Sequence, residues 1–425
     1  MEYLDLKKYI DSNEINGILS KIKGTDDLAL EKQRYQKLLD ETYDTYGPGD
    51  YHLLSSPGRS EIGGNHTDHQ HGNVLACGLN MDNIAVFRAN NENIVRYRDG
   101  DFKIKDVDLS NLNIQQEEIN TSEALIRGIA SRLNELGYKV GGFDALCNSE
   151  VLVGSGISSS ACFEMMVVEI FNHLYNNGVI GPVLRAKIGQ YSENVYFGKA
   201  SGLLDQMTIS VGGFTAIDFK DMADPKIESY DFSFEDYGYQ LFLVNTKGDH
   251  SDLSNEYSAI PAEMKKVAKQ LDKEVLVESS LDALLDNFVS IRENVNNDRA
   301  ILRSIHFYLE DERAIKEREA VKNKDIESLL FLMKESGRSS YEYLQNVYPV
   351  SRVYSQSLAI GLALCDICLK QDGAYRVHGG GFEGTIQAVV PNDKVNDFKS
   401  IMSKVFGDDC LMECKVRPFG TKTII

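Results

Sequence analysis

The sequence predicts an α+β protein built from two halves. Strand-like and helical segments alternate up to about residue 245, whereas helices dominate from about residue 256 to residue 369. Between two of the early segments, a glycine-bearing turn at residues 151–161 joins a short apolar run to a longer apolar stretch. Sheet and helix gathered in separate blocks are typical of the α+β class. The 425 residues allow roughly two to three domains.

The N-terminal part of the chain predicts helices followed by strands. Residues 1–50 are amphipathic, and a helix over residues 26–46 ends at a Gly-Pro-Gly turn. Strand patterns follow at residues 51–54, 84–87 and 94–97. Residues 56–73 between the first two are polar and glycine-bearing. A helix is then predicted over residues 121–137.

Residues 151–161 predict a strand, a glycine turn and a helix start. The apolar run 151–153 ends at Gly154 and Gly156, and three serines precede the apolar stretch. The first N–H groups of a helix have no internal partner and carry positive potential, so such a turn suits phosphate. A serine N-cap on a tight turn is the simpler interpretation of these eleven residues alone.

The remaining elements place a domain boundary near residue 235. A helix is expected to about residue 175 and another at 184–193, then a polar loop at 198–213 and a strand at 214–219. The acidic, aromatic stretch at 225–236 is typical of a connection, which gives domains 1–235 and 236–425. The second domain is expected to contain strands at 239–245 and 385–390, a helix at 395–406 and a final strand.

Composition excludes several classes of function. The chain has 45 basic and 64 acidic residues, a formal charge of −19, so general binding to nucleic acid or anionic membranes is disfavoured. The N-terminus lacks the basic head and apolar core of a signal peptide, and no apolar run reaches the length of a membrane span. An odd number of cysteines, seven, argues against a disulfide framework. We therefore expect a cytoplasmic protein.

Two patterns suggest sites that we do not favour. Cys365 and Cys368, with Cys410 and Cys414, could form a zinc site, but the first pair lies in a predicted buried helix, where free cysteine packs as a small hydrophobe. Residues 379–384 match G-x-G-x-x-G, the dinucleotide pattern. That pattern needs a strand before it and a helix after it, whereas here we expect a helix before and a strand after. The alternative interpretation, in which these glycines form a loop that lets a ligand approach the backbone, is kept.

The polar segment from Ser56 concentrates groups that bind anions and hydroxyls. Arg59 offers a fixed fork of donors that suits phosphate or a carboxylate. Asn65, His66 and Asp68 supply the mixed donors and acceptors that sugar hydroxyls need. Standing alone, the segment would be interpreted as a hydrated loop.

The order of four motifs resembles the GHMP kinases, and the galactokinases within them. The motifs are Pro57-Gly-Arg59…Gly64-Asn-His-Thr-Asp-His69, Gly154-Ser-Gly-Ile-Ser-Ser-Ser-Ala161, Gly202-Leu-Leu-Asp205-Gln206 and Gly379-Gly-Gly-Phe382. The similarity runs from about residue 50 to the end. It implies a two-domain GHMP kinase fold with the active site in the cleft between the domains.

The resemblance also implies a role for individual residues. Asp205 matches the catalytic aspartate and Arg59 the arginine beside it. The implied sugar contacts are Asn65, His66, Asp68, Gly202 and Tyr257. The implied ATP-binding turn consists of Gly154, Ser155, Gly156, Ser158, Ser159 and Ser160. Ser160 and Glu193 match the Mg²⁺ ligands, although a solvated helix position is the alternative for Glu193.

Three positions depart from the family pattern. Asn65 stands where galactokinases carry a glutamate that contacts the sugar, and Ser60-Glu61-Ile62 replaces an apolar-asparagine-leucine run. Glu383 replaces a glycine, and we expect its side chain to point to solvent. The departures leave the kinase prediction intact and put the identity of the sugar in question.

The implied function is ATP-dependent phosphorylation of a hexose at the anomeric C1 hydroxyl, and the favoured substrate is D-galactose, which would give galactose 1-phosphate. Alternatives are a kinase for N-acetylgalactosamine or arabinose, a non-catalytic galactokinase-like sugar sensor, and a GHMP kinase for mevalonate or homoserine. The expected partners are a small sugar and Mg-ATP, and the expected state is a monomer or weak homodimer.

Overall fold

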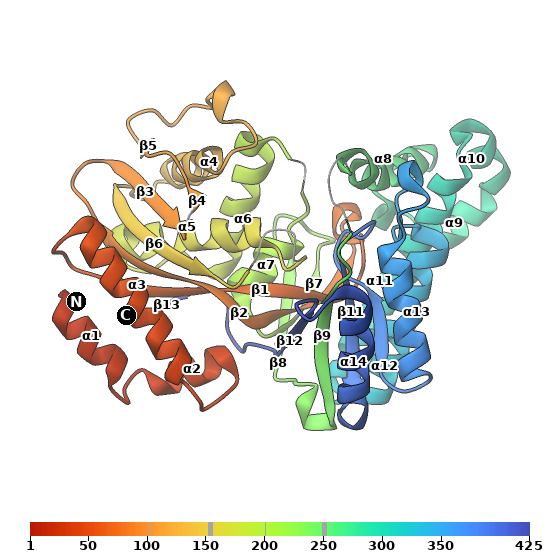
Figure 1. Cartoon of the computed structure of the whole chain (residues 1–425). Helices are drawn as coiled ribbons and strands as arrows, with labels where there is room; N and C mark the ends of the chain where they lie inside the picture. Colours follow the sequence, from red (N-terminus) through yellow and green to blue (C-terminus); the bar gives the residue numbers. More distant parts are fainter. Residues whose placement is uncertain (101, 152–155, 200, 249–252) are drawn as a thin grey trace.

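The computed structural model describes residues 1–100, 102–151, 156–199, 201–248 and 253–425. The chain forms two halves side by side, each built around one sheet (Figure 1). The N-terminal half carries the larger sheet, and most of the C-terminal half is helical. The predicted α+β class is confirmed.

The larger sheet is centred on two long antiparallel strands. Its main path runs in the order β13 (Lys422–Thr423), β1 (His52–Gly63), β2 (Asn73–Ala89), β6 (Phe143–Ser149), β3 (Ile94–Asp99) and β4 (Phe102–Lys103). Three strands branch from it: β5 (Val107–Asp108) on β3, β7 (Phe214–Asp218) on β2, and β8 (Lys226–Tyr230) on β7. Because β2 is long, its first residues pair with β7 and its last with β6.

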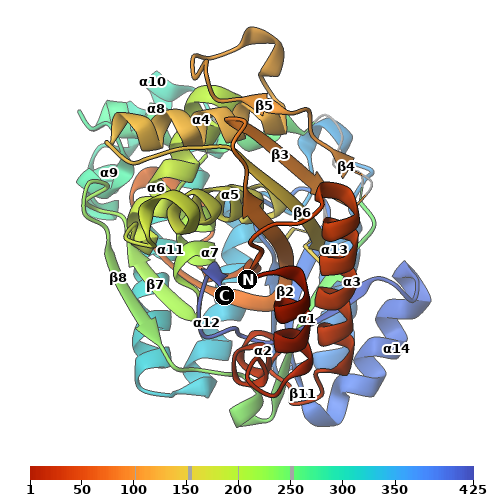
Figure 2. The ribbon, with the colours of Figure 1, turned by 90° about the vertical axis from the view of Figure 1, so that its left-hand side faces the viewer.

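Helices cover both faces of this sheet (Figure 2). Leu53 and Val86 pack in one cluster with helices α1 (Tyr3–Asp11), α2 (Asn16–Lys23) and α3 (Ala29–Tyr46). Leu54 and Phe87, one position along, pack in another with α4 (Ser122–Glu135) and α5 (Ser159–Asn176). Successive strand side chains point to opposite faces, so this alternation fixes the register of β1 and β2. Helices α6 (Pro182–Tyr191) and α7 (Leu204–Val211) lie against α5.

The C-terminal half has an antiparallel sheet and a helical region. The sheet order is β10 (Ala374–Val377), β11 (Thr385–Pro391), β9 (Tyr239–Asn245) and β12 (Leu411–Cys414). The helices are α8 (Ser254–Gln270), α9 (Leu281–Asp286), α10 (Phe288–Val295), α11 (Asp298–Lys322), α12 (Ile326–Ser339), α13 (Ser357–Leu369) and α14 (Val395–Phe406).

The two halves share a hydrophobic core. Leu241 of β9 and Met333 of α12 belong to the same buried cluster as Ile62 of β1 and Leu75 of β2. The last strand, β13, returns to β1, so the chain ends within the N-terminal half (Figure 1). All strands of the smaller sheet follow residue 236. The domain limits at 235 and 236 stay a prediction.

Several local predictions were wrong. The strand predicted at 51–54 continues as β1 through the buried residues 56–63, and residues 204–211 of the expected loop 198–213 form helix α7. Strand β6 ends at Ser149, so Val151 lies beyond it, and residues 152 and 153 are outside the described residues. Strand β10, not a helix, precedes the glycine loop at 379–384.

The cysteines and the helices were also considered from composition. All seven cysteines are free, and the described part of the chain holds no group of three or more His, Cys, Asp or Glu side chains suited to a metal. Among the described residues, no helix is both long and apolar enough to cross a bilayer.

Candidate active site

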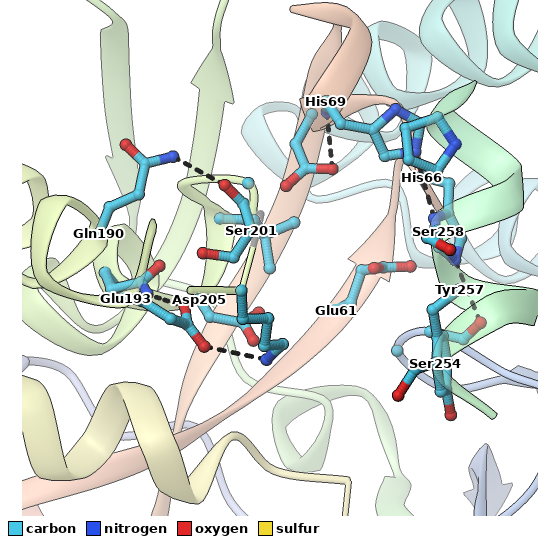
Figure 3. A pocket seen from close by; sticks show the side chains of 18 of the residues that line it. Glu61, His66, His69, Gln190, Glu193, Ser201, Asp205, Ser254, Tyr257 and Ser258 are labelled. Carbon is cyan, nitrogen blue, oxygen red and sulfur yellow. Dashed lines mark hydrogen bonds and ion pairs between the residues drawn. The ribbon is translucent and has the colours of Figure 1, made fainter. Parts of the chain in front are cut away.

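A cavity of about 1080 Å³ opens between the two halves. Its walls come from β1 and the turn after it, from residues 190–206, from the start of α8, and from the loop at 379–380 (Figure 3). Residues from both halves therefore enclose one space, as the cleft prediction requires.

Arg59 and Asp205 form a two-point ion pair on the wall of this cavity. The Arg59 Nε donates to Asp205 Oδ1 at 2.6 Å, and a terminal nitrogen donates to Oδ2 at 2.9 Å. Arg59 belongs to β1, and Asp205 lies in the first turn of α7. A negative side chain in the first turn of a helix is favoured by the helix dipole. Two distant segments are thus joined at one charged group.

The glycine-serine turn meets the same carboxylate. Ser158, the residue before α5, donates from Oγ to Asp205 Oδ2 at 2.5 Å. Arg59 also donates to the backbone oxygen of Gly156 at 2.6 Å. The Ser158 side chain therefore does not cap the helix, because its hydroxyl is used by Asp205. Three stretches that are far apart in sequence converge here.

The surroundings of Asp205 keep it ionised. Burial acts to raise the pKa of this carboxyl, but the charge of Arg59 and the hydrogen bonds from Arg59 and Ser158 outweigh burial. The net pKa lies below the ordinary value of 3.8. Opposite charge and hydrogen bonding to the charged form favour that form.

The remainder of the predicted ATP-binding turn is only partly described. Gly154 and Ser155 lie outside the described residues. Ser159 and Ser160 form the first turn of α5, an 18-residue helix, and Ser160 is exposed. The helix start predicted in this region is confirmed.

Glu193 is a buried cavity residue and not a solvated helix position. It lies in a short π-helical segment, Ser192–Phe197, that continues α6, and its side chain is 5% exposed. Lys199 contacts Glu193 Oε1 at 2.9 Å, and the Gln206 amide donates to Oε2 at 2.9 Å. The same amide donates to Glu164, whose other oxygen has no hydrogen-bond partner among the described residues. This corner of the cavity is rich in carboxylate oxygen, the donor type that Mg²⁺ prefers.

Asp68 and Gly202 fit together across the cavity wall. A Cβ atom at Gly202 would lie 1.7 Å from Asp68 Oδ2, so glycine makes room for this carboxyl. Burial, followed by the charge of Asp205, raises the pKa of Asp68 to about 6. His66 lies beside it, and burial lowers its pKa to about 4, which keeps the imidazole neutral.

Tyr257 enters the cavity from α8 in the opposite half. Its hydroxyl donates to the backbone oxygen of Gly381 at 3.1 Å, and its ring lies edge-on to Phe382. A Cβ at Gly380 would lie 2.7 Å from the tyrosine ring. The glycine loop at residues 379–384, which sequence analysis kept as a possible ligand-binding loop, thus forms part of the cavity wall. Its glycines permit the close approach of Tyr257.

Asn65 and Glu61 form a buried pair. Asn65 Nδ2 donates to Glu61 Oε1 at 2.9 Å, and the Arg376 guanidinium donates to the same oxygen at 2.7 Å. Both residues belong to the cavity lining, Asn65 at 0% exposure and Glu61 at 6%. Sequence reasoning noted Glu61 only as a departure from the family pattern and gave it no role. Its partner Arg376, 315 positions away, leaves no local signal.

Glu383 does not point to solvent as expected. It is 2% exposed, and its two oxygens accept hydrogen bonds from Ser355 and Ser357. It is absent from the described cavity lining. The prediction failed because the serine partners lie just before and at the start of α13 and come near Glu383 only in the fold.

Comparison with known proteins tests the family resemblance. The family model for the galactokinase galactose-binding signature matches residues 40–89, which include Arg59 and Asp68. The model for the GHMP kinases N terminal domain matches residues 124–213, which include Ser158 and Asp205. The chain therefore carries a galactokinase galactose-binding signature and a GHMP kinases N terminal domain, and it is similar to galactokinases.

Curated relatives of this family align over most of the chain. The galactokinase of Clostridium tetani is 28% identical over 84% of this chain and 88% of its own length. The galactokinase of Lactobacillus helveticus is 27% identical over 84% of this chain and 90% of its own length.

Solved structures share the fold at lower identity. Lactococcus lactis galactokinase, solved with galactose, has a TM-score of 0.77 at 22% identity, over 92% of this chain and 99% of its own. Methanococcus jannaschii mevalonate kinase has a TM-score of 0.61 at 16% identity, over 87% of this chain and 99% of its own. The predicted GHMP kinase fold is confirmed.

Proposed function

We propose that the protein is an ATP-dependent sugar 1-kinase that phosphorylates the anomeric hydroxyl of a hexose, with D-galactose the first candidate. The observation that carries the proposal is the meeting of Arg59, Ser158 and Asp205 at one cavity. The family relatives named galactokinase support the choice of galactose.

Asp205 would hold the sugar hydroxyl that attacks the phosphorus. A carboxylate within hydrogen-bond reach of a hydroxyl can accept its proton, and the attacking oxygen gains nucleophilicity. The low pKa of Asp205 keeps the group ionised but makes it a weak base. It therefore orients the hydroxyl first and takes the proton as the bond to phosphorus forms. Phosphoryl transfer depends mainly on such positioning and on charge stabilisation.

The turn before α5 would hold the ATP phosphates. The predicted Gly154–Ser160 stretch runs into the first turn of α5, an 18-residue helix that begins at Ser159 and whose first N–H groups suit an anion. The link from Ser158 to Asp205 supports a placement of the transferred phosphoryl group near the carboxylate. Because the chain is strongly acidic overall, local backbone dipoles and cations such as Arg59 and Lys199 must supply the attraction.

Mg²⁺ fits the donor set at this corner of the cavity. Glu193 lines the cavity and shares the Gln206 amide with Glu164, whose other oxygen has no partner among the described residues, and Ser160 is exposed in the first turn of α5. Glu193 and Ser160 would hold the ion, and it would neutralise phosphate charge when bound.

The sugar would lie between the His66–Asp68 turn, Gly202 and Tyr257. These residues line the same cavity as Asp205 and come from both halves (Figure 3). They offer a neutral imidazole, a carboxyl group and a phenol, which together can donate and accept hydrogen bonds with several hydroxyls.

A panel of acceptors tests the proposal. Release of ADP from Mg-ATP is measured with galactose, N-acetylgalactosamine, arabinose, talose, mevalonate and homoserine. We expect turnover with galactose and a phosphate at C1, identified by NMR. Calorimetric binding of sugar without turnover would favour a sensor, and turnover with mevalonate or homoserine alone would overturn the sugar assignment.

The cellular location, the oligomeric state and the partners are part of the same proposal. A cytoplasmic location is supported by seven free cysteines, which a reducing compartment maintains. We propose a monomer or weak homodimer that acts on a small sugar and Mg-ATP, with no nucleic-acid or membrane partner.

A further inference from the structure

The side chain of Asn65 has no hydrogen-bonding capacity left for a ligand. Its Nδ2 donates to Glu61 Oε1 at 2.9 Å and to the backbone oxygen of Gly379 at 2.8 Å. Its Oδ1 accepts from Asn346 at 2.9 Å and from Ser340 at 3.2 Å. An amide has two N–H donors and an oxygen with two lone pairs. With 0% exposure, Asn65 could reach a sugar only by losing a protein partner.

The carboxyl group of Glu61 is held on one oxygen only. Oε1 accepts from Asn65 and from Arg376, while no described residue donates to Oε2. The side chain lines the cavity and extends between the Asp205–Glu193 group and the His66–Tyr257 group (Figure 3). A buried carboxyl oxygen on a cavity wall with no protein donor is an acceptor available to a ligand.

The carboxyl is also fixed in place before a ligand arrives. Arg376 is 0% exposed, lies in β10 of the other half, and donates in addition to the backbone oxygen of Ile62. Asn65 is anchored by Asn346, Ser340 and Gly379. Glu61 is therefore oriented by a positive and a neutral donor on one side and open to the cavity on the other. A fixed acceptor loses little entropy when it binds.

We propose that Glu61 binds a sugar hydroxyl through Oε2, and that Asn65 is a positioning residue that orients Glu61 without touching the sugar. The inference deepens the proposed function and rests on it. Asp205 faces the hydroxyl that is phosphorylated, so Glu61 selects a second hydroxyl of the same sugar. In its ionised form the carboxylate makes a charge-assisted hydrogen bond, about twice as strong as a neutral one.

The substitution Glu61→Gln and a set of monodeoxy sugars test the proposal. With the sugar that the wild type accepts, we expect E61Q to raise the sugar KM about 10- to 100-fold, the loss of one charge-assisted hydrogen bond, and to leave the ATP KM unchanged. One monodeoxy analogue should show a similar loss with the wild type and no additional loss with E61Q. An unchanged sugar KM in E61Q would overturn the proposal.

Two further variants separate Glu61 from its neighbours. Glu383→Gln is the matched control, because Glu383 is also a buried carboxyl but lies outside the described cavity lining, and its kinetics should match the wild type. Asn65→Ala should weaken sugar binding yet keep the discrimination against the same deoxy analogue. Discrimination that disappears in N65A and persists in E61Q would make Asn65 the contact and overturn the inference.

Binding measurements keep this test separate from the test of kinase activity. If E61Q does not fold, Glu61→Asp, which keeps the charge and shortens the side chain by one methylene, takes its place with the same expected loss. If the wild type binds sugar by calorimetry without turnover, weaker binding to the variant supports the role of Glu61 although the kinase proposal fails. If the wild type phosphorylates the sugar and substitution of Glu61 changes neither KM nor binding, the kinase proposal stands and the proposal for Glu61 is overturned.

Discussion

The guanidinium of Arg59 engages both carboxyl oxygens of Asp205, although 146 positions separate the two residues. One residue belongs to a central strand of the larger sheet and the other begins a helix beside it. Their pairing fixes the charge and the direction of the carboxylate toward the cavity. The behaviour of this pair leads to the first two predictions.

Replacement of Asp205 should abolish turnover without unfolding the protein. In Asp205→Asn the amide keeps the shape but cannot accept a proton from the hydroxyl. We expect kcat to fall about 10²- to 10⁴-fold, the range for loss of a positioned acid–base group. ADP release measures the rate, and thermal unfolding monitored by circular dichroism checks the fold. Activity within a factor of two of the wild type would contradict the role of Asp205.

Removal of the Arg59 charge should move the acid limb of the pH profile upward. Arg59 offsets the effect of burial, so without it the pKa of Asp205 rises. Because the ionised form is the active one, Arg59→Gln should lose activity at a higher pH than the wild type does. The measurement is kcat between pH 4 and pH 8, with the exposed Arg338→Gln as the control. An acid limb that stays in place would assign the titration to another group.

Gly202 should not tolerate a methyl group. In Gly202→Ala the new Cβ would collide with Asp68 Oδ2, so the carboxyl must move from its place in the cavity. We expect the sugar KM to rise and the ATP KM to change little. Gly17→Ala provides the matched control, since no described atom lies within 4 Å of a Cβ there and the glycine is inside helix α2. That variant should keep full activity, and equal effects of the two changes would contradict the prediction.

Glu61 should make the stability of the protein depend on pH. Burial raises its pKa to about 7 from an ordinary 4.5, despite the opposing charges of Arg376 and Arg59, with Asp68 acting in the same direction as burial. Between these two values the folded state binds more protons than the unfolded state. The contribution of Glu61 to the free energy of unfolding therefore falls as pH rises from about 4.5 to 7, then levels off.

Denaturant unfolding of the wild type and E61Q at pH 5, 6, 7 and 8 measures this contribution. The wild type should lose stability relative to E61Q as pH rises. Asp68 titrates in both proteins, so the difference between them reports Glu61 together with its charge interaction with Asp68. A difference that grows in the opposite direction, or not at all, would show that Glu61 is ionised throughout.

The cysteines should behave as separate thiols and not as a zinc site. Burial raises the pKa of Cys365 and Cys414, and six of the seven side chains are buried, with Cys368 partly exposed. In the native protein we expect fast reaction of Cys368 alone with a thiol reagent, and of all seven in denaturant. A chelator should leave the melting temperature of the nucleotide-free protein unchanged. Stoichiometric zinc in the purified protein would contradict this prediction.

Local sequence signals were sufficient for many elements. The Gly-Pro-Gly stop after residue 46, the helix start within the serines before Ala161 and the apolar strand at 239–245 all depend on neighbouring residues. Turn chemistry and periodicity act over a few positions, so they can be read along the chain. The order of the motifs likewise indicated the resemblance to galactokinases, because each motif is continuous in sequence.

Predictions failed where polar residues find distant partners. Residues 56–63 look like a solvated loop, yet Arg59 and Glu61 are buried in β1 because Asp205 and Arg376 neutralise them across 146 and 315 positions. Local polarity cannot distinguish a hydrated loop from a strand whose charges are paired by the fold. For the same reason Glu383 was expected in solvent, whereas it is buried against two serines.

The sequence by itself determined the fold class and the similarity to galactokinases, and it singled out Arg59 and Asp205 as the pair to test, since these signals reside in composition and in continuous motifs. Only the tertiary structure decided which side chains keep a hydrogen-bonding group that no protein partner uses. Asn65 and Glu61 are four positions apart, and both were visible as departures from the family pattern. That Asn65 is fully bonded and Glu61 keeps an oxygen open depends on Asn346, Gly379 and Arg376, which the fold brings from the other half.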